Sequence, residues 1–150
     1  MAETRITLPY APRRVFLDYH NRTERWACIV AHRRCGKTVA CIQDLTIRAG
    51  SHKGKEPRFA YIGPTYTQAK TIAFDYLVHY AQPIPGITPR VSELSMDYPN
   101  GGQVRLFGAD NPDALRGIYL DGVVFDEYGL QPPKIFSEVI RPALSDRQGW

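Results

Sequence analysis

The stretch that decides the fold is "IVAHRRCGKTVACI", residues 29–42. Its centre, "AHRRCGKT" (residues 31–38), fits the phosphate-loop (Walker A) pattern G-x-x-x-x-G-K-[ST] except that alanine replaces the first glycine. The preceding run "RWACIVA" (residues 25–31) is continuous and apolar, which is typical of a buried parallel strand. Residues 37–49 then carry apolar residues at helical spacing, and Gly50 is expected to end that helix. Strand, loop and helix in this order are the context that the pattern requires.

Each fixed position of the loop has a chemical task. Backbone N–H groups of the loop and of the following helix surround a β-phosphate, and the helix dipole favours its negative charge. Gly36 permits the tight turn, Lys37 supplies a positive charge for the β- and γ-phosphates, and the Thr38 hydroxyl is a ligand for Mg²⁺. Ala31 is small enough for the turn from strand to loop, although it lacks the backbone freedom of glycine. The expected nucleotide-binding positions are Ala31, Arg33, Arg34, Cys35, Gly36, Lys37, Thr38 and Asp126.

A pair of acids follows a second apolar run, "VVFDE" at residues 123–127. At the carboxyl end of a strand, Asp126 is placed to hold Mg²⁺ opposite Thr38, and Glu127 is placed to activate the attacking water. An isolated acidic strand end has no ligand as a rule, but the phosphate loop upstream favours the catalytic interpretation. The pair therefore indicates hydrolysis coupled to work rather than phosphoryl transfer to a small molecule.

Three arginines are further candidates. Arg33 and Arg34 lie inside the loop, where their side chains either reach the γ-phosphate or point to solvent. Arg116 precedes the strand that carries Asp126 and is either a finger for the γ-phosphate, in the same chain or in the next subunit of a ring, or an ordinary surface residue. The sequence leaves both choices open.

The rest of the chain alternates strands and helices. The other expected elements are a strand at 58–63, a helix within 64–81, a β-hairpin within 93–108, an apolar strand within 119–129 and a helix at 132–144. Thr65 and Gln68 have the spacing of a capping box. This alternation predicts an α/β layer structure with a mainly parallel sheet.

Composition narrows the class of protein. The 150 residues and 43% hydrophobic content suit one domain with a single core, and no apolar run of eighteen residues predicts a membrane span. The three cysteines lack zinc-site spacing and are expected to be reduced thiols of a cytoplasmic protein. Residues 1–58 hold twelve Lys and Arg against five Asp and Glu, a basic excess that suits a polyanion such as nucleotide or nucleic acid.

Four segments together resemble the large terminase subunit of tailed bacteriophages, the ATPase that drives double-stranded DNA into a procapsid. They are "AHRRCGKT", "YIGPTYTQAK", "NPDALRGIYLDGVVFDEYG" and "IRPALSDRQGW", and Leu-Arg-Gly ahead of the Asp-Glu strand is the most specific feature. The resemblance implies a three-layer P-loop NTPase of the RecA-like, additional-strand catalytic-glutamate (ASCE) type. It also implies ATP and Mg²⁺ as cofactors, and hydrolysis coupled to DNA translocation.

Position by position, the resemblance assigns roles to this chain's residues. Lys37 and Thr38 would bind phosphate and Mg²⁺, Asp126 would hold Mg²⁺, and Glu127 would activate water. Arg33 or Arg34 matches the family's loop arginine, and Arg116 matches its finger toward the adjacent subunit. The segment "LPYAPRRVF" would hold the adenine, with Arg13 and Arg14 where relatives often carry glutamine. The implied partners are double-stranded DNA, a portal protein, a small terminase subunit and further copies in a ring, without a membrane, in the host cell cytoplasm.

In that family a coupling motif, further strands and a nuclease domain follow the segment "DRQGW". Residues 1–150 are therefore expected to be the N-terminal portion of the ATPase domain, truncated after the Asp-Glu strand and its following helix. Such a piece is expected to be a weak ATPase without nuclease activity. Two alternatives stay open: a helicase-like nucleic-acid-dependent ATPase, and a non-catalytic nucleic-acid-binding module with a degenerate phosphate loop, which Ala31 and the basic first part suggest.

Overall fold

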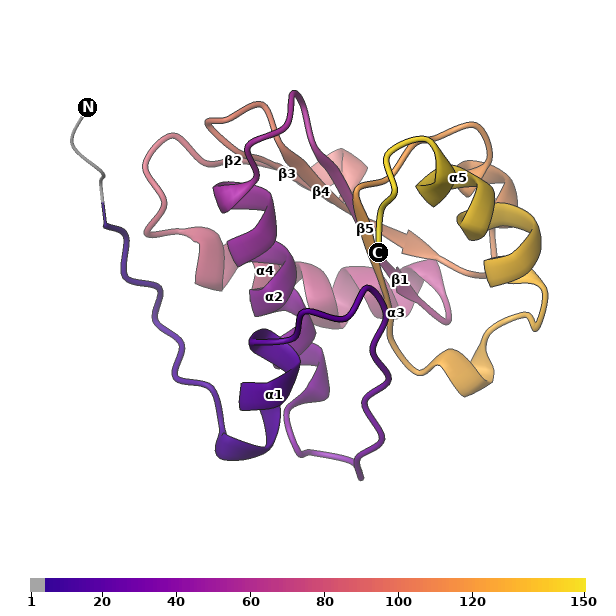
Figure 1. Cartoon of the computed structure of the whole chain (residues 1–150), viewed down its shortest axis with the longest axis horizontal. Helices are drawn as coiled ribbons and strands as arrows, with labels where there is room; N and C mark the ends of the chain where they lie inside the picture. Colours follow the sequence, from indigo (N-terminus) through magenta and orange to yellow (C-terminus); the bar gives the residue numbers. More distant parts are fainter. Residues whose placement is uncertain (1–4) are drawn as a thin grey trace.

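The computed structural model describes residues 5–150 as a five-stranded sheet with helices on both faces (Figure 1). The strands are β1 Arg58–Gly63, β2 Thr88–Arg90, β3 Ser95–Asp97, β4 Gln103–Gly108 and β5 Gly122–Phe125, in the spatial order β2-β3-β4-β1-β5. β1 pairs in parallel with β4 and β5, whereas β3 is antiparallel to β2 and β4. The sheet is therefore mixed, because among the described strands β3 runs against the other four.

The helices are short apart from the one that follows the loop. The α-helices are α1 Leu17–His20, α2 Lys37–Ser51, α3 Tyr66–Gln68, α4 Asp75–Ala81 and α5 Arg141–Ser145. The 3-10 turns are η1 Arg14–Phe16, η3 Val91–Glu93, η4 Pro112–Leu115 and η5 Tyr128–Leu130, and the π-helical segments are η2 Ala69–Phe74 and η6 Phe136–Ile140.

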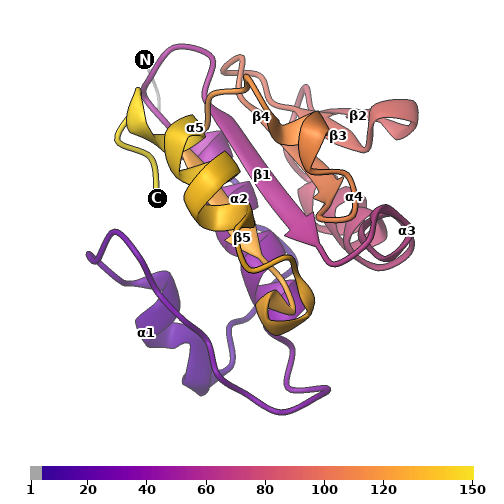
Figure 2. The ribbon, with the colours of Figure 1, turned by 90° about the vertical axis from the view of Figure 1, so that its right-hand side faces the viewer.

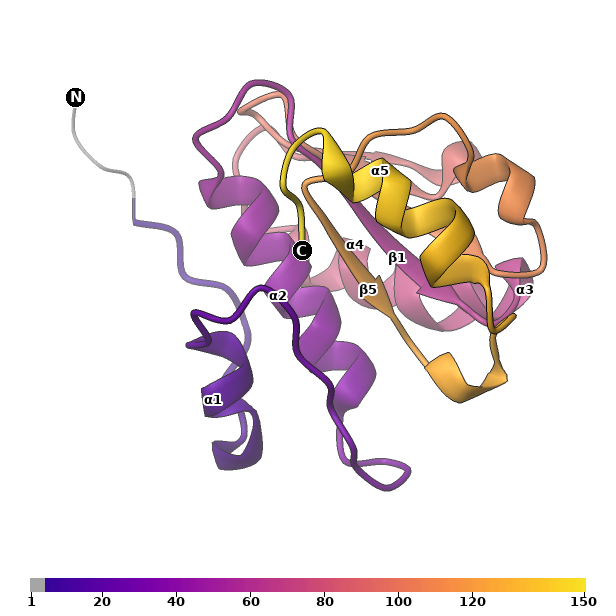
Figure 3. The ribbon, with the colours of Figure 1, turned by 45° about the vertical axis from the view of Figure 1, so that its right-hand side comes forward.

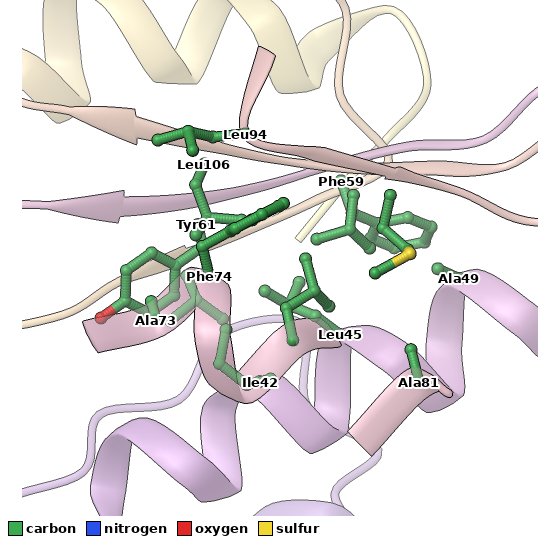
Figure 4. Packing of buried hydrophobic residues seen from close by; sticks show 14 of the residues in the cluster. Ile42, Leu45, Ala49, Phe59, Tyr61, Ala73, Phe74, Ala81, Leu94 and Leu106 are labelled. Carbon is green, nitrogen blue, oxygen red and sulfur yellow. The ribbon is translucent and has the colours of Figure 1, made fainter. Parts of the chain in front are cut away.

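Alternate side chains of β1 enter two separate cores, because successive residues of a strand point to opposite faces. Phe59 and Tyr61 join the core beneath α2 and α4, where their neighbours interlock as Figure 4 shows. Ala60 and Ile62 join the second core, beneath η6 and α5. Figure 2 and Figure 3 show α5 on one side of β1 and β5, and α2 on the other. The expected three-layer α/β architecture is confirmed.

The helix expected after the loop is confirmed as α2, but it does not end at Gly50. It continues to Ser51, whose Oγ donates a hydrogen bond to the carbonyl of Ile47 at 2.7 Å and so satisfies one carbonyl of the last turn. Ile42 and Leu45 are fully buried, which anchors the helix on the sheet (Figure 4). α2 therefore holds the loop residues at its start in a fixed place.

The remaining elements differ from expectation mainly at their ends. The helix within 64–81 begins as expected, since the Thr65 side chain accepts a hydrogen bond from the Gln68 N–H at 3.2 Å, and then widens into the π-helical η2. The hairpin is confirmed as β3 and β4, whereas β2 was not among the expected elements. The helix expected from Pro132 begins at Phe136 instead, because Pro132 accepts a turn bond from the N–H of Ile135.

The strand expected at residues 25–31 is wrong. The segment has no strand pairing among the described residues, Val30 is 93% exposed and Trp26 is 53% exposed. On the side of β5 that does not pair with β1, the described backbone partner is Trp150. The Trp150 carbonyl accepts from the N–H of Val123 at 2.7 Å, and the Trp150 N–H donates to the carbonyl of Asp121 at 3.2 Å. The segment lies across a groove from β5 rather than beside it, so no ladder forms.

Two expectations from composition concern membrane-spanning segments and the three cysteines. No helix within residues 5–150 is both long and apolar enough to cross a lipid bilayer. Cys28, Cys35 and Cys41 are free, in agreement with the expected reduced thiols.

A buried carboxylate ties the N-terminal segment to α2. Asp44, with 4% of its side chain exposed, accepts from Arg22 and Arg48 at 2.9 Å each. Asp44→Ala would leave the buried Arg22 uncompensated, so we expect the free energy of unfolding to fall by about 3 kcal/mol in urea titrations. Asp113→Ala is the matched control, because Asp113 is 86% exposed; it should leave that free energy unchanged. An equal, small effect of both substitutions would contradict this account.

Candidate active site

The loop before α2 closes around the ammonium group of Lys37. Arg34 and Gly36 have positive φ angles of 62° and 97°, which reverse the chain just before the helix begins. Lys37 Nζ donates to the carbonyl oxygens of Ala31 at 2.9 Å and His32 at 3.3 Å. The free N–H groups at the start of the 15-residue α2 lie beside this ammonium group. The loop thus gathers the donors and the positive charge that a phosphate requires.

The carboxylate of Asp126 joins three elements at the end of β5. Its Oδ2 accepts from Thr38 Oγ1, at the start of α2, and from Tyr61 Oη, on β1, each at 2.6 Å. Its Oδ1 accepts from the N–H of Glu127 at 3.0 Å. Burial and, next, the negative charge of Asp126 raise the pKa of Tyr61, so the phenol stays protonated and remains a donor. Loop and acid, separated by 88 residues in sequence, therefore meet side chain to side chain.

Glu127 lies in a sharp turn directly after Asp126. Its φ is +50°, and its side chain is exposed. The buried Gln131 fixes this turn, because its Nε2 donates to the carbonyl of Asp126 at 2.8 Å and to that of Ile62 at 2.9 Å. Within residues 5–150 the Glu127 carboxylate has no hydrogen-bond or ion-pair partner, so the turn places it, unpaired, beside the paired carboxylate of Asp126.

A groove of about 660 Å³ runs between residues 25–31 and β5. Its lining includes Lys37, Asp126 and Glu127, the arginines Arg22 and Arg25, and apolar side chains such as Trp26 and Phe136. The two rings meet edge to face at 5.5 Å between centroids. Lys37, Asp126 and Glu127 are the cation and the two acids that a phosphate-hydrolysing site combines.

The N-terminal segment contacts the phosphate loop at two residues. Arg13 Nη1 donates to the carbonyl of Cys35 at 2.9 Å, and the buried Phe16 lies 3.7 Å from where a Cβ on Gly36 would be. The segment expected to hold an adenine is thus in contact with the loop, although its role there stays a prediction.

Comparisons with known proteins agree with this geometry. No protein-family model matches the chain. A large terminase of a thermophilic bacteriophage, solved in complex with ADP, shares the fold with a TM-score of 0.59 at 20% identity, over 78% of this chain and 29% of that one. The curated large terminase subunit of Thermus phage G20c is 29% identical over 163 aligned residues, covering 95% of this chain and 33% of that protein.

The solved ATPase domain of the Thermus phage P74-26 large terminase superposes with a TM-score of 0.82 at 28% identity, over 94% of this chain and 63% of that chain. This chain is a homologue of phage large terminases. It has the RecA-like P-loop fold of their ATPase domain. The chain spans about one third of the length of the curated relatives that it matches.

The three candidate arginines of this terminase homologue lie on its surface. Arg33 and Arg34 are exposed, and within residues 5–150 neither guanidinium group has a hydrogen-bond or ion-pair partner. The Arg116 side chain is 60% exposed, pairs with Asp113 at 3.1 Å and does not line the groove that holds Lys37. The structure therefore does not bring Arg116 to the phosphate loop of its own chain, and a role toward a neighbouring copy stays a prediction.

Two residues that contact Asp126 were missed from the sequence of this terminase homologue. Tyr61 lies in the strand expected at 58–63, and Gln131 lies between the strand expected within 119–129 and the helix expected at 132–144. The hydroxyl of Tyr61 in an otherwise apolar strand was the available signal, because a buried hydroxyl requires a partner. Gln131 gave no signal, since its contacts depend on how the turn after β5 folds back over β1.

Proposed function

We propose that this chain is the ATP-binding and ATP-hydrolysing part of a viral DNA-packaging motor, a terminase large subunit that drives double-stranded DNA into a procapsid. The observation that carries the proposal is the meeting of the loop and the acids. Lys37, Asp126 and Glu127 line the groove, and Thr38 Oγ1 donates a hydrogen bond to Asp126, so the four residues bring together groups that suit phosphate-bond hydrolysis.

The residues around Thr38 suit a nucleotide-bound Mg²⁺ ion. The Thr38 hydroxyl and the Asp126 carboxylate are hard oxygen ligands whose oxygens lie 2.6 Å apart. The loop expected to receive the phosphates leads directly into α2, the helix that carries Thr38 at its start. When bound, Mg²⁺ neutralises charge that develops on the β- and γ-phosphate oxygens. In this proposal Lys37 exchanges its two carbonyl partners for phosphate oxygens, and residues Arg33–Thr38 supply backbone N–H groups to the phosphates.

Glu127 is the group proposed to activate water. Its carboxylate accepts a proton as the water oxygen bonds to the γ-phosphorus, while the bond from that phosphorus to the β–γ bridging oxygen breaks. Gln131 keeps Glu127 in place through the Asp126 carbonyl. Arg33 or Arg34 in the same chain, and Arg116 toward a neighbouring subunit, complete the set of proposed cations. A role toward a neighbouring subunit suits Arg116, because its side chain is exposed and does not line the groove that holds Lys37.

The assembly and extent of the motor are further parts of the proposal. Its partners are double-stranded DNA, a portal protein, a small terminase subunit and other copies in a ring, in the host cell cytoplasm. Residues 1–150 correspond in this proposal to the part of the ATPase domain that holds the phosphate loop and the Asp-Glu pair, and the chain covers 63% of a solved one. On its own, this portion is expected to hydrolyse ATP slowly and not to cleave DNA.

Competition between nucleotides tests the proposal. Because the loop is built around the β-phosphate, ATP and ADP should each displace a fluorescent ATP analogue from the chain in the presence of Mg²⁺, whereas AMP should require about a hundredfold higher concentration. Displacement by AMP as effective as that by ADP would show that the loop does not read the β-phosphate. That result would contradict the proposed function.

A further inference from the structure

The Asp126 carboxylate depends on a hydroxyl that lies outside the loop motif. Its Oδ2 accepts two hydrogen bonds, and the second donor, Tyr61 Oη, is as close as Thr38 Oγ1. Tyr61 is 3% exposed. Its backbone belongs to β1, where it is in register with Leu106 of β4 on one side and Val124 of β5 on the other. This donor is thus held by a strand that is paired on both sides.

We propose that Tyr61 is a positioning residue that holds the Asp126 carboxylate in the orientation that faces Thr38. The inference rests on the proposed function. Thr38 has a second task as an expected ligand of Mg²⁺, whereas the Tyr61 hydroxyl donates its proton to Asp126. The Glu127 N–H donates to Oδ1 of Asp126, and the Tyr61 hydroxyl donates to Oδ2. Both oxygens of the Asp126 carboxylate are therefore held in place before a nucleotide binds.

The expected loss of Mg²⁺-dependent nucleotide affinity follows from the role of Tyr61 as a group that orients a metal ligand. Removing a group that orients a metal ligand typically lowers metal affinity 10–100-fold. In Tyr61→Phe the ring still fills the core beneath α2, so the change is confined to the hydroxyl (Figure 4). We therefore expect a loss in the Mg²⁺-dependent part of nucleotide affinity and no loss in the metal-free part.

Tyr98 supplies a matched control. It is also 3% exposed and belongs to the same core, but its Oη has no hydrogen-bond partner among the described residues. Tyr98→Phe removes the same atom from the same core without touching Asp126. It should leave nucleotide affinity unchanged with and without Mg²⁺.

The experiment titrates a fluorescent ADP analogue into wild type, Tyr61→Phe and Tyr98→Phe, once with Mg²⁺ and once with EDTA. Wild type should bind more tightly with Mg²⁺, and Tyr61→Phe should lose about tenfold of that gain while matching wild type in EDTA. The match in EDTA also shows that the variant is folded. A full Mg²⁺ gain in Tyr61→Phe, or an equal loss in Tyr98→Phe, would overturn the positioning role.

A double-mutant cycle separates this inference from the function beneath it. Asp126→Asn should remove the Mg²⁺ gain, and adding Tyr61→Phe should then have no further effect, because Tyr61 acts through Asp126. Additive losses would contradict the inference and leave the proposed function intact. A wild-type chain that fails to bind the ADP analogue would contradict both.

Discussion

Glu127→Gln is expected to lower the rate of ATP hydrolysis about a thousandfold while leaving the affinity for ATP unchanged. Glutamine keeps the size of the side chain and suits the same turn at φ +50°, but it cannot accept the proton of the attacking water. Because Gln131 and not Glu127 pins the turn, the substitution should leave Asp126 in place. Single-turnover release of phosphate, together with an ATP-binding titration, measures both quantities.

The matched control for that substitution is Glu93→Gln. Glu93 is a half-exposed glutamate in η3, at the opposite edge of the sheet from β5, where its partner is Arg90. Its substitution should change neither rate nor affinity. Glu127→Gln with the hydrolysis rate of wild type would contradict the role of Glu127 as the group that activates water.

Lys37→Ala is expected to weaken ATP binding about a hundredfold, because one charge-assisted contact to phosphate is lost. The ammonium group bonds two loop carbonyls, of Ala31 and His32, that are exposed and can turn to water when it is removed. The melting temperature should therefore stay close to that of wild type, and calorimetric titration with ATP reports the loss directly.

Lys70→Ala is the control for the lysine charge. Lys70 is exposed on η2 and lies outside the groove, so its removal lowers the net charge by the same amount without touching the loop. Equal affinities of Lys37→Ala, Lys70→Ala and wild type would show that the loop does not hold phosphate. The non-catalytic interpretation of the chain would then be favoured.

The site could be predicted where its chemistry is local in sequence. The spacing of Gly36, Lys37 and Thr38 predicts the turn and the helix start, and the acidic end of an apolar strand predicts that Asp126 reaches the same edge. The position of Asp126 follows from the rule that the carboxyl ends of parallel strands meet at one edge of a sheet. The contact between Thr38 and Asp126 confirms this placement.

The parts that could not be predicted depend on which strands are neighbours. Residues 25–31 have the composition of a buried strand, yet composition does not supply a pairing partner, and the groove separates them from β5. Tyr61 reaches Asp126 because β1 is the immediate neighbour of β5, and the sequence does not specify that order. For Arg116 the sequence leaves open a role as a finger or a place at the surface, and in the structure its side chain is exposed and pairs with Asp113.

A crystal structure of the chain with Mg²⁺ and ADP tests the central claim most directly. We expect the β-phosphate to lie against the N–H groups of residues 35–38, with Lys37 Nζ moved from the carbonyl of Ala31 to a phosphate oxygen. A metal ion should lie between the phosphates and the Thr38 hydroxyl, on the side of Asp126. ADP bound away from the loop, with Lys37 still bonded to Ala31, would contradict the account.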